Sequence, residues 1–335
     1  MSRKIVLDSL ELSFILIQMN RNVLLSEPDS IYRDIIKSIL TKSGYNCFCA
    51  VEENDILKSI DEDGIEIAII DVQIVKTAKE NILEKIKKKS SIPVILCTDD
   101  DVSKYLDIVL KYKIMQVLNK PIKASELLLV LDKNLNLNKN NLFGLQNYLP
   151  GLEKTHIKEI RSSSQVKEVI KGIIDITNDN VYSADKRMEI YLVLQEILTN
   201  AIYHSHGFSA EKKEGIPVDL PEPYKVVVEY GVVNDKVGIS VRDFCGKLCH
   251  DKIIEPLYAA YKQHIMLEDS FEKGEDITDM VTLDGRGLDL IRKLTGEHYF
   301  ITEPDKSTEI ILIYDGTFET DSSYSGIRIF ELSDN

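Results

Sequence analysis

The stretch Ile67-Ala68-Ile69-Ile70-Asp71 decides the fold of the N-terminal part of this 335-residue chain. Four apolar residues in a row, without polar alternation, are typical of a strand covered on both faces of a parallel sheet. The aspartate stands where the strand ends, and functional groups of open parallel sheets gather at the carboxyl ends of the strands. The stretch therefore predicts a central buried strand with a carboxylate at its functional end.

Apolar runs and amphipathic stretches alternate on both sides of this strand. The expected strands cover residues 23–25, 45–51, 65–70, 93–97 and 114–118. The expected helices cover residues 31–41, 54–60, 78–88, 103–112 and 125–135. Five strands alternating with five helices predict a (βα)5 doubly wound α/β domain over residues 22–138.

The order of elements changes after residue 155. Helices are expected at residues 165–176, 184–204 and 287–295, and strands at residues 156–161, 224–232, 236–241, 298–302 and 309–314. Helices collected before and between antiparallel strands predict a separate α+β two-layer sandwich over residues 155–316. The remaining parts are expected to be an N-terminal extension (residues 1–21), a linker (residues 139–154, with Pro150-Gly151) and a C-terminal tail (residues 317–335).

Charge and composition exclude several classes of protein. Asp and Glu total 55 against 41 Lys and Arg, a formal net charge of −14. This balance argues against a broad nucleic-acid or anionic-membrane surface, because both require clustered cations. The apolar run at residues 14–17 is far shorter than the ~18–20 residues of a membrane span, and no signal cleavage site follows it. With five cysteines, an odd number, the chain is expected to be cytoplasmic.

Four polar side chains stand at expected strand ends of the first domain: Glu27, Asp71, Thr98 and Lys120. Carboxylates, a hydroxyl and a lysine that converge at one edge are suited to a hard cation and to phosphoryl oxygens. Solvated loop positions are the alternative interpretation of each residue taken alone.

This ordered set resembles the receiver domain of two-component response regulators over residues 22–138. The resemblance implies that Asp71 is the phosphoacceptor, that Thr98 and Lys120 contact the phosphoryl group, and that Glu27 and Asp71 hold Mg²⁺. It also implies an upstream histidine kinase as a partner.

Four departures from the receiver pattern leave a docking surface without phosphorylation as an alternative. One is that residues 72–79 lack the usual Met-Pro and Gly signals after the phosphoacceptor. Pro28 stands at the second acid position, and Val117 stands where the family carries an aromatic residue. Thr98 is followed by Asp99, Asp100 and Asp101, whose charges are expected to repel a phosphoryl group.

The second domain carries three separate polar motifs. Glu196, Asn200 and His204 have i, i+4, i+8 spacing and so line one face of a helix, where an amide oxygen suits Mg²⁺ and a carboxylate suits a base. Asp243 leaves a strand into a turn, where it can accept from an exocyclic amine such as that of adenine. Asp284-Gly285-Arg286-Gly287 opens a helix whose free N–H groups suit phosphate. Each motif alone also fits an ordinary wet helix face or loop.

Together the motifs resemble the ATP-binding fold shared by gyrase and histidine kinases over about residues 155–315. Within it, Glu-Ile-Leu-Thr-Asn-Ala-Ile at 196–202 and Gly-Arg-Gly-Leu at 285–288 are most similar to the anti-sigma-factor serine kinases. The resemblance implies an ATP and Mg²⁺ cofactor pair. Its site residues are Asn200 as the Mg²⁺ ligand, Glu196 as the general base, Asp243 at the adenine, Gly285 and Gly287 at the phosphates, and Gly246 and Thr308 nearby.

We therefore expect a signalling protein in which a receiver-like domain regulates an ATP-dependent serine/threonine kinase. Its partner would be a small regulatory protein, either an antagonist-like substrate or a sigma factor, and a homodimer is compatible with this interpretation. Cys245, where the family has Gly, favours the alternative of a non-catalytic ATP-sensing or partner-sequestering switch module with a degenerate receiver. Residues 249–283 are expected to form either an ATP lid or a partner-binding helix.

Cysteine spacing also raises a zinc interpretation. Cys47 and Cys49 alternate along an expected strand, and Cys245 and Cys249 are followed by His250. No second Cys pair stands at zinc-finger spacing, so buried free cysteines are expected instead.

Overall fold

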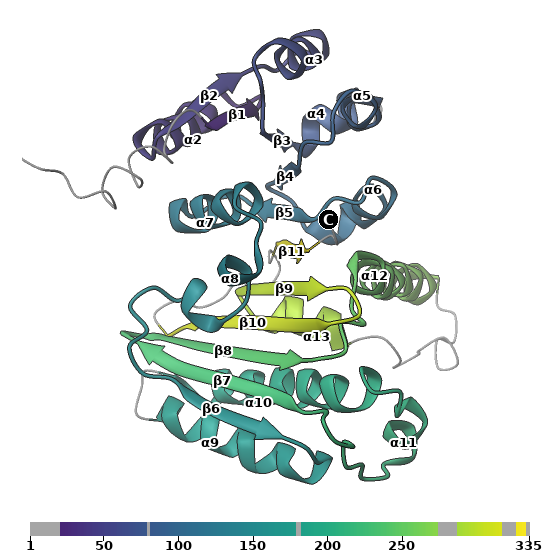
Figure 1. The fold of residues 1–335 in the computed structure, drawn as a ribbon. Coiled ribbons are helices and arrows are strands. Elements are labelled where there is room, and N and C mark those ends of the chain that lie inside the picture. Colours follow the sequence, from purple (N-terminus) through teal and green to yellow (C-terminus); the bar gives the residue numbers. More distant parts are fainter. Residues whose placement is uncertain (1–20, 79–80, 179–181, 274–286, 317–325, 333–335) are drawn as a thin grey trace, which may run out of the picture. The chain divides into compact units, whose positions relative to one another are not determined.

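A computed structural model describes residues 21–78, 81–178, 182–273, 287–316 and 326–332 (Figure 1). The chain divides into two compact units. The first unit comprises Met1–Thr98 and Ile122–Leu135, and the second comprises Asp99–Pro121 and Asn136–Asn335.

The first unit contains a parallel sheet with the strand order β2-β1-β3-β4. Its strands are β1 (Arg21–Ser26), β2 (Tyr45–Cys49), β3 (Ile67–Asp71) and β4 (Val94–Thr98). Every residue of β3 and β4 is buried, as expected for strands covered on both faces. The α/β class predicted for the N-terminal domain is therefore confirmed.

Helices of the first unit are α2 (Ser30–Lys42), α3 (Glu53–Glu62), α4 (Val72–Thr77), α5 (Asn81–Lys89) and α7 (Ala124–Leu135). The expected helix over residues 78–88 corresponds to α5, whereas α4, which begins directly after β3, was not predicted. The cause of this helix start is a cap: the side chain of Asp71 accepts a hydrogen bond from the backbone N–H of Gln73.

The second unit is built on a mixed sheet with the order β5-β11-β9-β10-β8-β7-β6. Its strands are β5 (Gln116–Asn119), β6 (His156–Ile160), β7 (Val226–Val233), β8 (Lys236–Asp243), β9 (Glu297–Glu303), β10 (Ser307–Asp315) and β11 (Ile327–Glu331). Neighbouring strands are antiparallel except for β11 and β9, which run parallel.

The last described strand, β11, lies in the segment expected to be a C-terminal tail. It pairs with β5 on one side, where Ile327 opposes Val117, and with β9 on the other. Gly326 approaches so closely that a Cβ atom would come within 2.3 Å of the carbonyl oxygen of Val117. The buried Val117 thus lies directly beside the C-terminal strand in the sheet.

Helices α9 (Val166–Asn178) and α10 (Ala184–Thr199) lie side by side along one face of this sheet, and α13 (Gly287–Leu294) contacts α10 (Figure 1). The segment expected to be a linker covers another part of the sheet. Its short helices α8 (Lys139–Leu142) and η2 (Leu145–Asn147) bury Leu142, Leu145 and Leu149. A Cβ atom at Gly238 of β8 would lie 2.8–2.9 Å from the side chains of Leu145 and Leu149, so glycine permits this close contact.

Residues 249–283 were expected to form a lid or a partner-binding helix. Their described part is one long helix, α12 (His250–Glu272), which contacts α6 (Leu106–Lys111) and the 3₁₀ turn η1 (Val102–Tyr105). His250 is buried and bonded through Nε2 to the backbone carbonyl of Ile114 at 3.1 Å.

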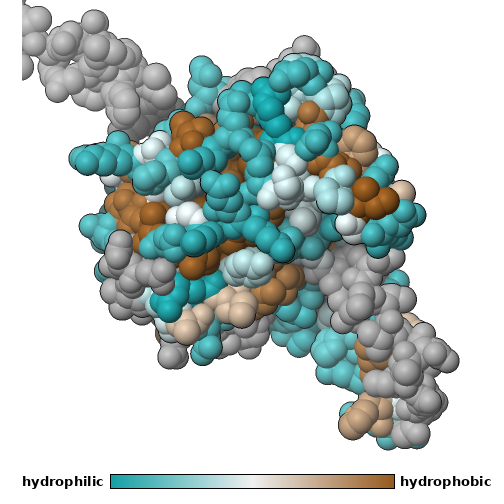
Figure 2. Space-filling view, turned by 90° about the horizontal axis from the view of Figure 1, so that it is seen from below, coloured by the Kyte–Doolittle hydropathy of each residue, from teal (hydrophilic) through white to brown (hydrophobic). Residues whose placement is uncertain are grey.

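The surface seen from below in Figure 2 mixes hydrophilic side chains with brown apolar ones. Exposed apolar residues of the second unit include Ile157, Met188, Leu192 and Ile216. Among the helices that the structure describes, none is long and apolar enough to cross a lipid bilayer.

Candidate functional site

Three potential metal ligands meet at the carboxyl ends of the strands in the first unit. Ligand atoms of Glu27, Asp71 and Cys97 all lie within 4.8 Å of one another, and all three residues are buried. They converge because β1, β3 and β4 are parallel neighbours, with Asp71 directly opposite Cys97 in the register. Thr98, the next residue of β4, is also buried.

Local hydrogen bonds orient the two carboxylates. Asp71 Oδ1 accepts from Gln73 N at 2.7 Å, and Glu27 Oε1 accepts from Asp29 N at 3.0 Å. Asp29 is itself the N-cap of α2, accepting from Tyr32 N at 2.9 Å. Two carboxylates beside a thiol are a donor set for a divalent cation.

The sequence pattern predicted Glu27 and Asp71 as metal ligands and overlooked Cys97. The signal was available, because Cys97 immediately precedes the predicted Thr98 at the end of an apolar run. Among the five cysteines only Cys97 is buried, whereas Cys47, Cys245 and Cys249 are half-buried and Cys49 is exposed. The expectation that these four are buried was therefore wrong.

Lys120 and the three aspartates after Thr98 belong to the second unit. Lys120 follows β5 and precedes a cis peptide bond to Pro121. Asp100 contacts Lys104 at 2.6 Å, and Asp101 accepts from Ser103 N at 2.9 Å as the N-cap of η1. At least two of the three carboxylates thus have structural partners.

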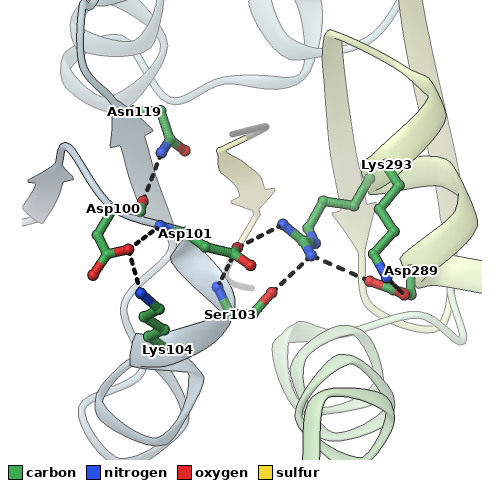
Figure 3. A network of polar contacts seen from close by, with 8 residues as sticks. Asp100, Asp101, Ser103, Lys104, Asn119, Asp289 and Lys293 are labelled. Atoms are coloured by element: carbon green, nitrogen blue, oxygen red, sulfur yellow. Dashed lines mark hydrogen bonds and ion pairs between the residues drawn. The ribbon is translucent and has the colours of Figure 1, made fainter. Parts of the chain in front are cut away.

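Asp101 is also part of a polar network that joins η1 to α13 (Figure 3). Arg292 on α13 donates to Ser103 Oγ at 2.7 Å, to Asp289 Oδ1 at 3.3 Å and to Asp101 Oδ1 at 3.4 Å. The Arg292 side chain is only 4% exposed, so its charge is balanced mainly by these neighbours. Lys293 completes the network through Asp289.

Glu196 and Asn200 lie together at the end of α10, as their spacing predicted. Asn200 Nδ2 donates to Glu196 Oε1 at 2.9 Å. Asn200 begins a π-helical turn, η4 (Asn200–His204), in which Ser205 N donates to Asn200 O at 3.2 Å. Single π turns inside helices are frequent at functional sites, because the extra residue redirects side chains.

A lysine that the sequence analysis did not single out completes this cluster. The ammonium of Lys212, on α11 (Ser209–Glu214), lies 2.7 Å from Asn200 Oδ1 and 3.5 Å from Glu196 Oε1. It also lies 3.4 Å from His204 Nε2. Burial and the Lys212 charge lower the pKa of His204, which favours the neutral imidazole.

Asp243 stands at the end of β8 in a nearly dry environment. Ser205 Oγ donates to Oδ2 at 3.0 Å and Cys245 N donates to Oδ1 at 2.9 Å. Burial raises the pKa of this carboxyl, while these hydrogen bonds act in the opposite direction. Thr308 lies directly opposite Asp243 on β10, and its buried Oγ1 has no hydrogen-bond partner among the described residues.

The two described glycines of the predicted site make close approaches of different kinds. A Cβ atom at Gly287 would lie 2.1 Å from Glu196 Oε1, so the start of α13 lies against the Glu196 side chain. Gly246 has φ +58° and would meet the backbone of the turn at Glu303–Lys306 at 2.4–2.7 Å. Gly285 falls outside the described residues.

A cavity of about 590 Å³ opens beside Asp243. Its walls include Phe208, Tyr224 and Phe244, and Lys247 and Lys252 supply positive charge at its edge. Cys245 also lines it, and burial with the neighbouring Asp243 raises the pKa of that thiol to about 11, so the sulfur is a neutral wall atom. Aromatic walls with a few charged groups are typical of sites for planar ligands.

Comparison with known proteins concerns the N-terminal part. Residues 23–132 match the family model of the response regulator receiver domain. Similar solved structures include a signal receiver domain of an HD domain-containing protein from Pseudomonas fluorescens Pf-5, with 21% identity, 35% of this chain and 96% of that chain covered, and a TM-score of 0.33. A response regulator receiver domain protein from Clostridium thermocellum has 23% identity, with 35% and 95% covered and a TM-score of 0.32. A response regulator from Thermotoga maritima has 18% identity, with 35% and 99% covered and a TM-score of 0.32.

The family match thus identifies residues 23–132 as a response regulator receiver domain.

Proposed function

We propose that this chain is a signal-transduction protein whose receiver domain regulates an ATP-binding domain of the gyrase and histidine kinase type. In this proposal the ATP-binding domain transfers a phosphoryl group to a Ser or Thr hydroxyl of a small regulatory protein. An upstream histidine kinase or phosphotransfer protein is the proposed source of the input at Asp71.

The observation that carries the proposal is the buried pair of Asp243 and Thr308. A carboxylate and a hydroxyl face each other across β8 and β10, and the hydroxyl has no described partner. Unsatisfied buried polar groups are rare in folded proteins because they cost about 1–3 kcal/mol, so a ligand is a natural explanation. An acceptor and a hydroxyl side by side suit the amine and ring nitrogen of adenine.

Convergence of the three motifs supports the same proposal. Gly287 lies against Glu196, and Ser205, one residue after the π turn, donates to Asp243. These two contacts connect Gly287, the last residue of the glycine loop, to α10, and the residue after the π turn to the end of β8. ATP fits this donor set: Asp243 and Thr308 would contact the adenine ring, and the start of α13 would contact the phosphates.

Magnesium fits less well. Its expected ligand, Asn200 Oδ1, is already held by the Lys212 ammonium at 2.7 Å. We therefore assign no step to a metal at this position. Glu196 is the proposed base for the partner hydroxyl, because its side chain is 29% exposed and is held by Asn200.

Regulation is supported by the Arg292 network (Figure 3). Arg292 contacts Asp101, the N-cap of η1 three positions after Thr98 in the chain, and Ser103 within η1. Arg292 lies on α13, whose first residue, Gly287, touches Glu196. A displacement of η1 would therefore be transmitted to α13.

Calorimetric titration of the full-length protein with ATP tests the proposal. Wild type should bind ATP and prefer it over GTP at least tenfold, because the 6-oxo group of guanine would face the Asp243 carboxylate. Asp243→Asn should weaken ATP binding at least tenfold, about 1.4 kcal/mol. Asp235→Asn, an exposed aspartate at the other end of β8, should bind like wild type.

Two outcomes would contradict the proposal. One is the absence of ATP binding by wild type, and the other is equal binding by wild type and Asp243→Asn. Circular dichroism of each variant confirms that a loss of binding is not a loss of the fold.

A further inference from the structure

We propose that Lys212 replaces the divalent cation at Glu196 and Asn200, so that nucleotide phosphates bind at this site without a metal ion. This inference rests on the proposed ATP site and concerns which cation serves it. It departs from the expected magnesium ligand Asn200.

Three donor atoms surround the ammonium as they would surround a cation. These are Asn200 Oδ1 at 2.7 Å, Glu196 Oε1 at 3.5 Å and His204 Nε2 at 3.4 Å. All three belong to the i, i+4, i+8 set that the sequence singled out, in which Asn200 is the expected Mg²⁺ ligand and Glu196 the expected base. The cluster therefore has the donors of a metal site and contains its own positive charge.

Lys212 is held in place by contacts at both ends of α11. At the start of this helix, Ser209 Oγ lies 2.8 Å from His204 Nδ1. After its end, Gly215 adopts φ +68°, and Tyr203 Oη donates to Ile216 O at 3.0 Å. These contacts tie α11 to the π turn, so the ammonium reaches Asn200 from a fixed backbone.

Lys212 and a metal ion compete for the same ligand, Asn200 Oδ1, because of their charge and geometry. Magnesium binds oxygen ligands at about 2.0–2.1 Å and demands near-octahedral geometry. An ion bound to Asn200 Oδ1 would lie within about 5 Å of the ammonium, where two cations repel each other. A neutral His204, whose pKa is lowered, can accept from the ammonium and adds no competing charge.

A lysine is a well-suited substitute because an ammonium is a compact point charge with three donors that can reach phosphate oxygens. The side chain of Lys212 is 26% exposed, so one side of the ammonium remains accessible to a ligand. Phosphate oxygens would thus exchange with, or add to, its contacts to Asn200 and Glu196.

The test is ATP binding by the full-length protein in EDTA and in excess Mg²⁺. Wild type should bind ATP in EDTA within about threefold of its affinity in Mg²⁺. Lys212→Met, which keeps most of the side-chain volume, should lose at least tenfold in EDTA and recover part of it in Mg²⁺. Lys212→Arg should retain binding in EDTA, and Lys213→Met, at an exposed neighbour on the same helix, should match wild type.

A direct metal assay gives a second readout without nucleotide. Titration with Mn²⁺, followed by its paramagnetic resonance signal, should show an added site in Lys212→Met relative to wild type. The Asp71→Asn substitution in both proteins removes the receiver cluster from the comparison. Thermal unfolding of Lys212→Met excludes misfolding as a cause.

The outcomes separate the two proposals. ATP binding by wild type that requires Mg²⁺, or binding by Lys212→Met in EDTA equal to wild type, overturns this inference and leaves the ATP site standing. Absence of ATP binding by wild type in both buffers overturns the ATP site, and the inference with it.

Discussion

Gly287 lies so close to Glu196 that a single added methyl group would come within 2.1 Å of the carboxylate oxygen and 2.5 Å of Cγ. This contact joins the first residue of α13 to the last turn of α10. In the chain, 87 residues separate the end of α10 from the start of α13. It makes the position of the Glu196 side chain depend on the start of α13.

Gly287→Ala is expected to displace Glu196 from Asn200. Because the clash includes Cγ as well as the carboxylate, the whole side chain must move, and ATP affinity should fall about tenfold. Gly172→Ala is the matched control, since its Cβ atom would lie at an ordinary 3.5 Å from Tyr230 Oη. In the interior of α9 it should raise stability by about 0.5–1 kcal/mol and leave ATP binding unchanged. Equal ATP binding by Gly287→Ala and wild type would contradict the contact.

Arg292→Met is expected to loosen η1 from α13. The substitution leaves Asp101 and Ser103 without their cation donor, but Asp101 is 36% exposed and can be hydrated. We therefore expect a loss of about 1–3 kcal/mol in unfolding free energy, below the ~3–5 kcal/mol of a fully buried pair. Urea denaturation measures it, and amide exchange should rise at residues 102–106.

Lys293→Met serves as the control for that experiment. Lys293 contacts the same Asp289, but its side chain is 52% exposed, so the cost should stay below about 0.5 kcal/mol. A similar loss in both variants would show that burial of the Arg292 network adds nothing to stability.

His298 is expected to make the second unit sensitive to acid. Complete burial lowers the pKa of His298 to about 3, with the positive charge of Arg328 contributing, against 6.5 in the unfolded chain. Between these values the unfolded chain binds more protons, so the stabilisation is complete above pH 6.5 and is lost as pH falls. From pH 7.5 to pH 5 the loss should be about 2 kcal/mol.

Urea unfolding at pH values between 7.5 and 5 measures this loss of unfolding free energy. Between pH 7.5 and pH 5, His298→Gln should lose about 2 kcal/mol less unfolding free energy than wild type, whatever its stability at pH 7.5. His264→Gln, at a side chain that is 62% exposed, should keep the wild-type pH dependence. If the unfolding free energy of His298→Gln depends on pH as strongly as that of wild type, the acid sensitivity belongs to other groups.

Asp71 is expected to form an acyl phosphate with a small phosphodonor such as acetyl phosphate, in a reaction that requires Mg²⁺ or Mn²⁺. The buried cluster of Glu27, Asp71 and Cys97 supplies the cation ligands. Intact-mass spectrometry should show one added phosphoryl group in wild type and none in Asp71→Asn. The N-cap variant Asp29→Asn should still react, and phosphorylation of Asp71→Asn to the wild-type level would assign the acceptor elsewhere.

The sequence predicts best what depends on neighbours along the chain. The run before Asp71 specifies a buried strand through its own composition, and the helical repeat places Glu196 beside Asn200, with the expected contact at 2.9 Å. Both predictions need only the period of a strand or a helix.

Features that depend on distant segments escaped prediction. Lys212 lies on a six-residue helix after an irregular loop, where no period links it to Asn200. In the sequence, Arg292 has the pattern of a surface cation on an amphipathic helix. In the structure it contacts Ser103 and Asp101, which lie 189 and 191 residues away in the chain. Cys97 becomes a candidate ligand only when β3 and β4 are aligned.

The pairing of β11 with β5 has a consequence for synthesis of the protein. Gln116 Nε2 donates to the carbonyl of Ile329, 213 residues further along the chain. At about 5–20 residues per second, ribosomes take roughly ten seconds or more to make the intervening polypeptide. Until then the β5 edge lacks this partner, and a nascent chain interrupted before Ile327 would expose an open strand edge to chaperones or to other chains.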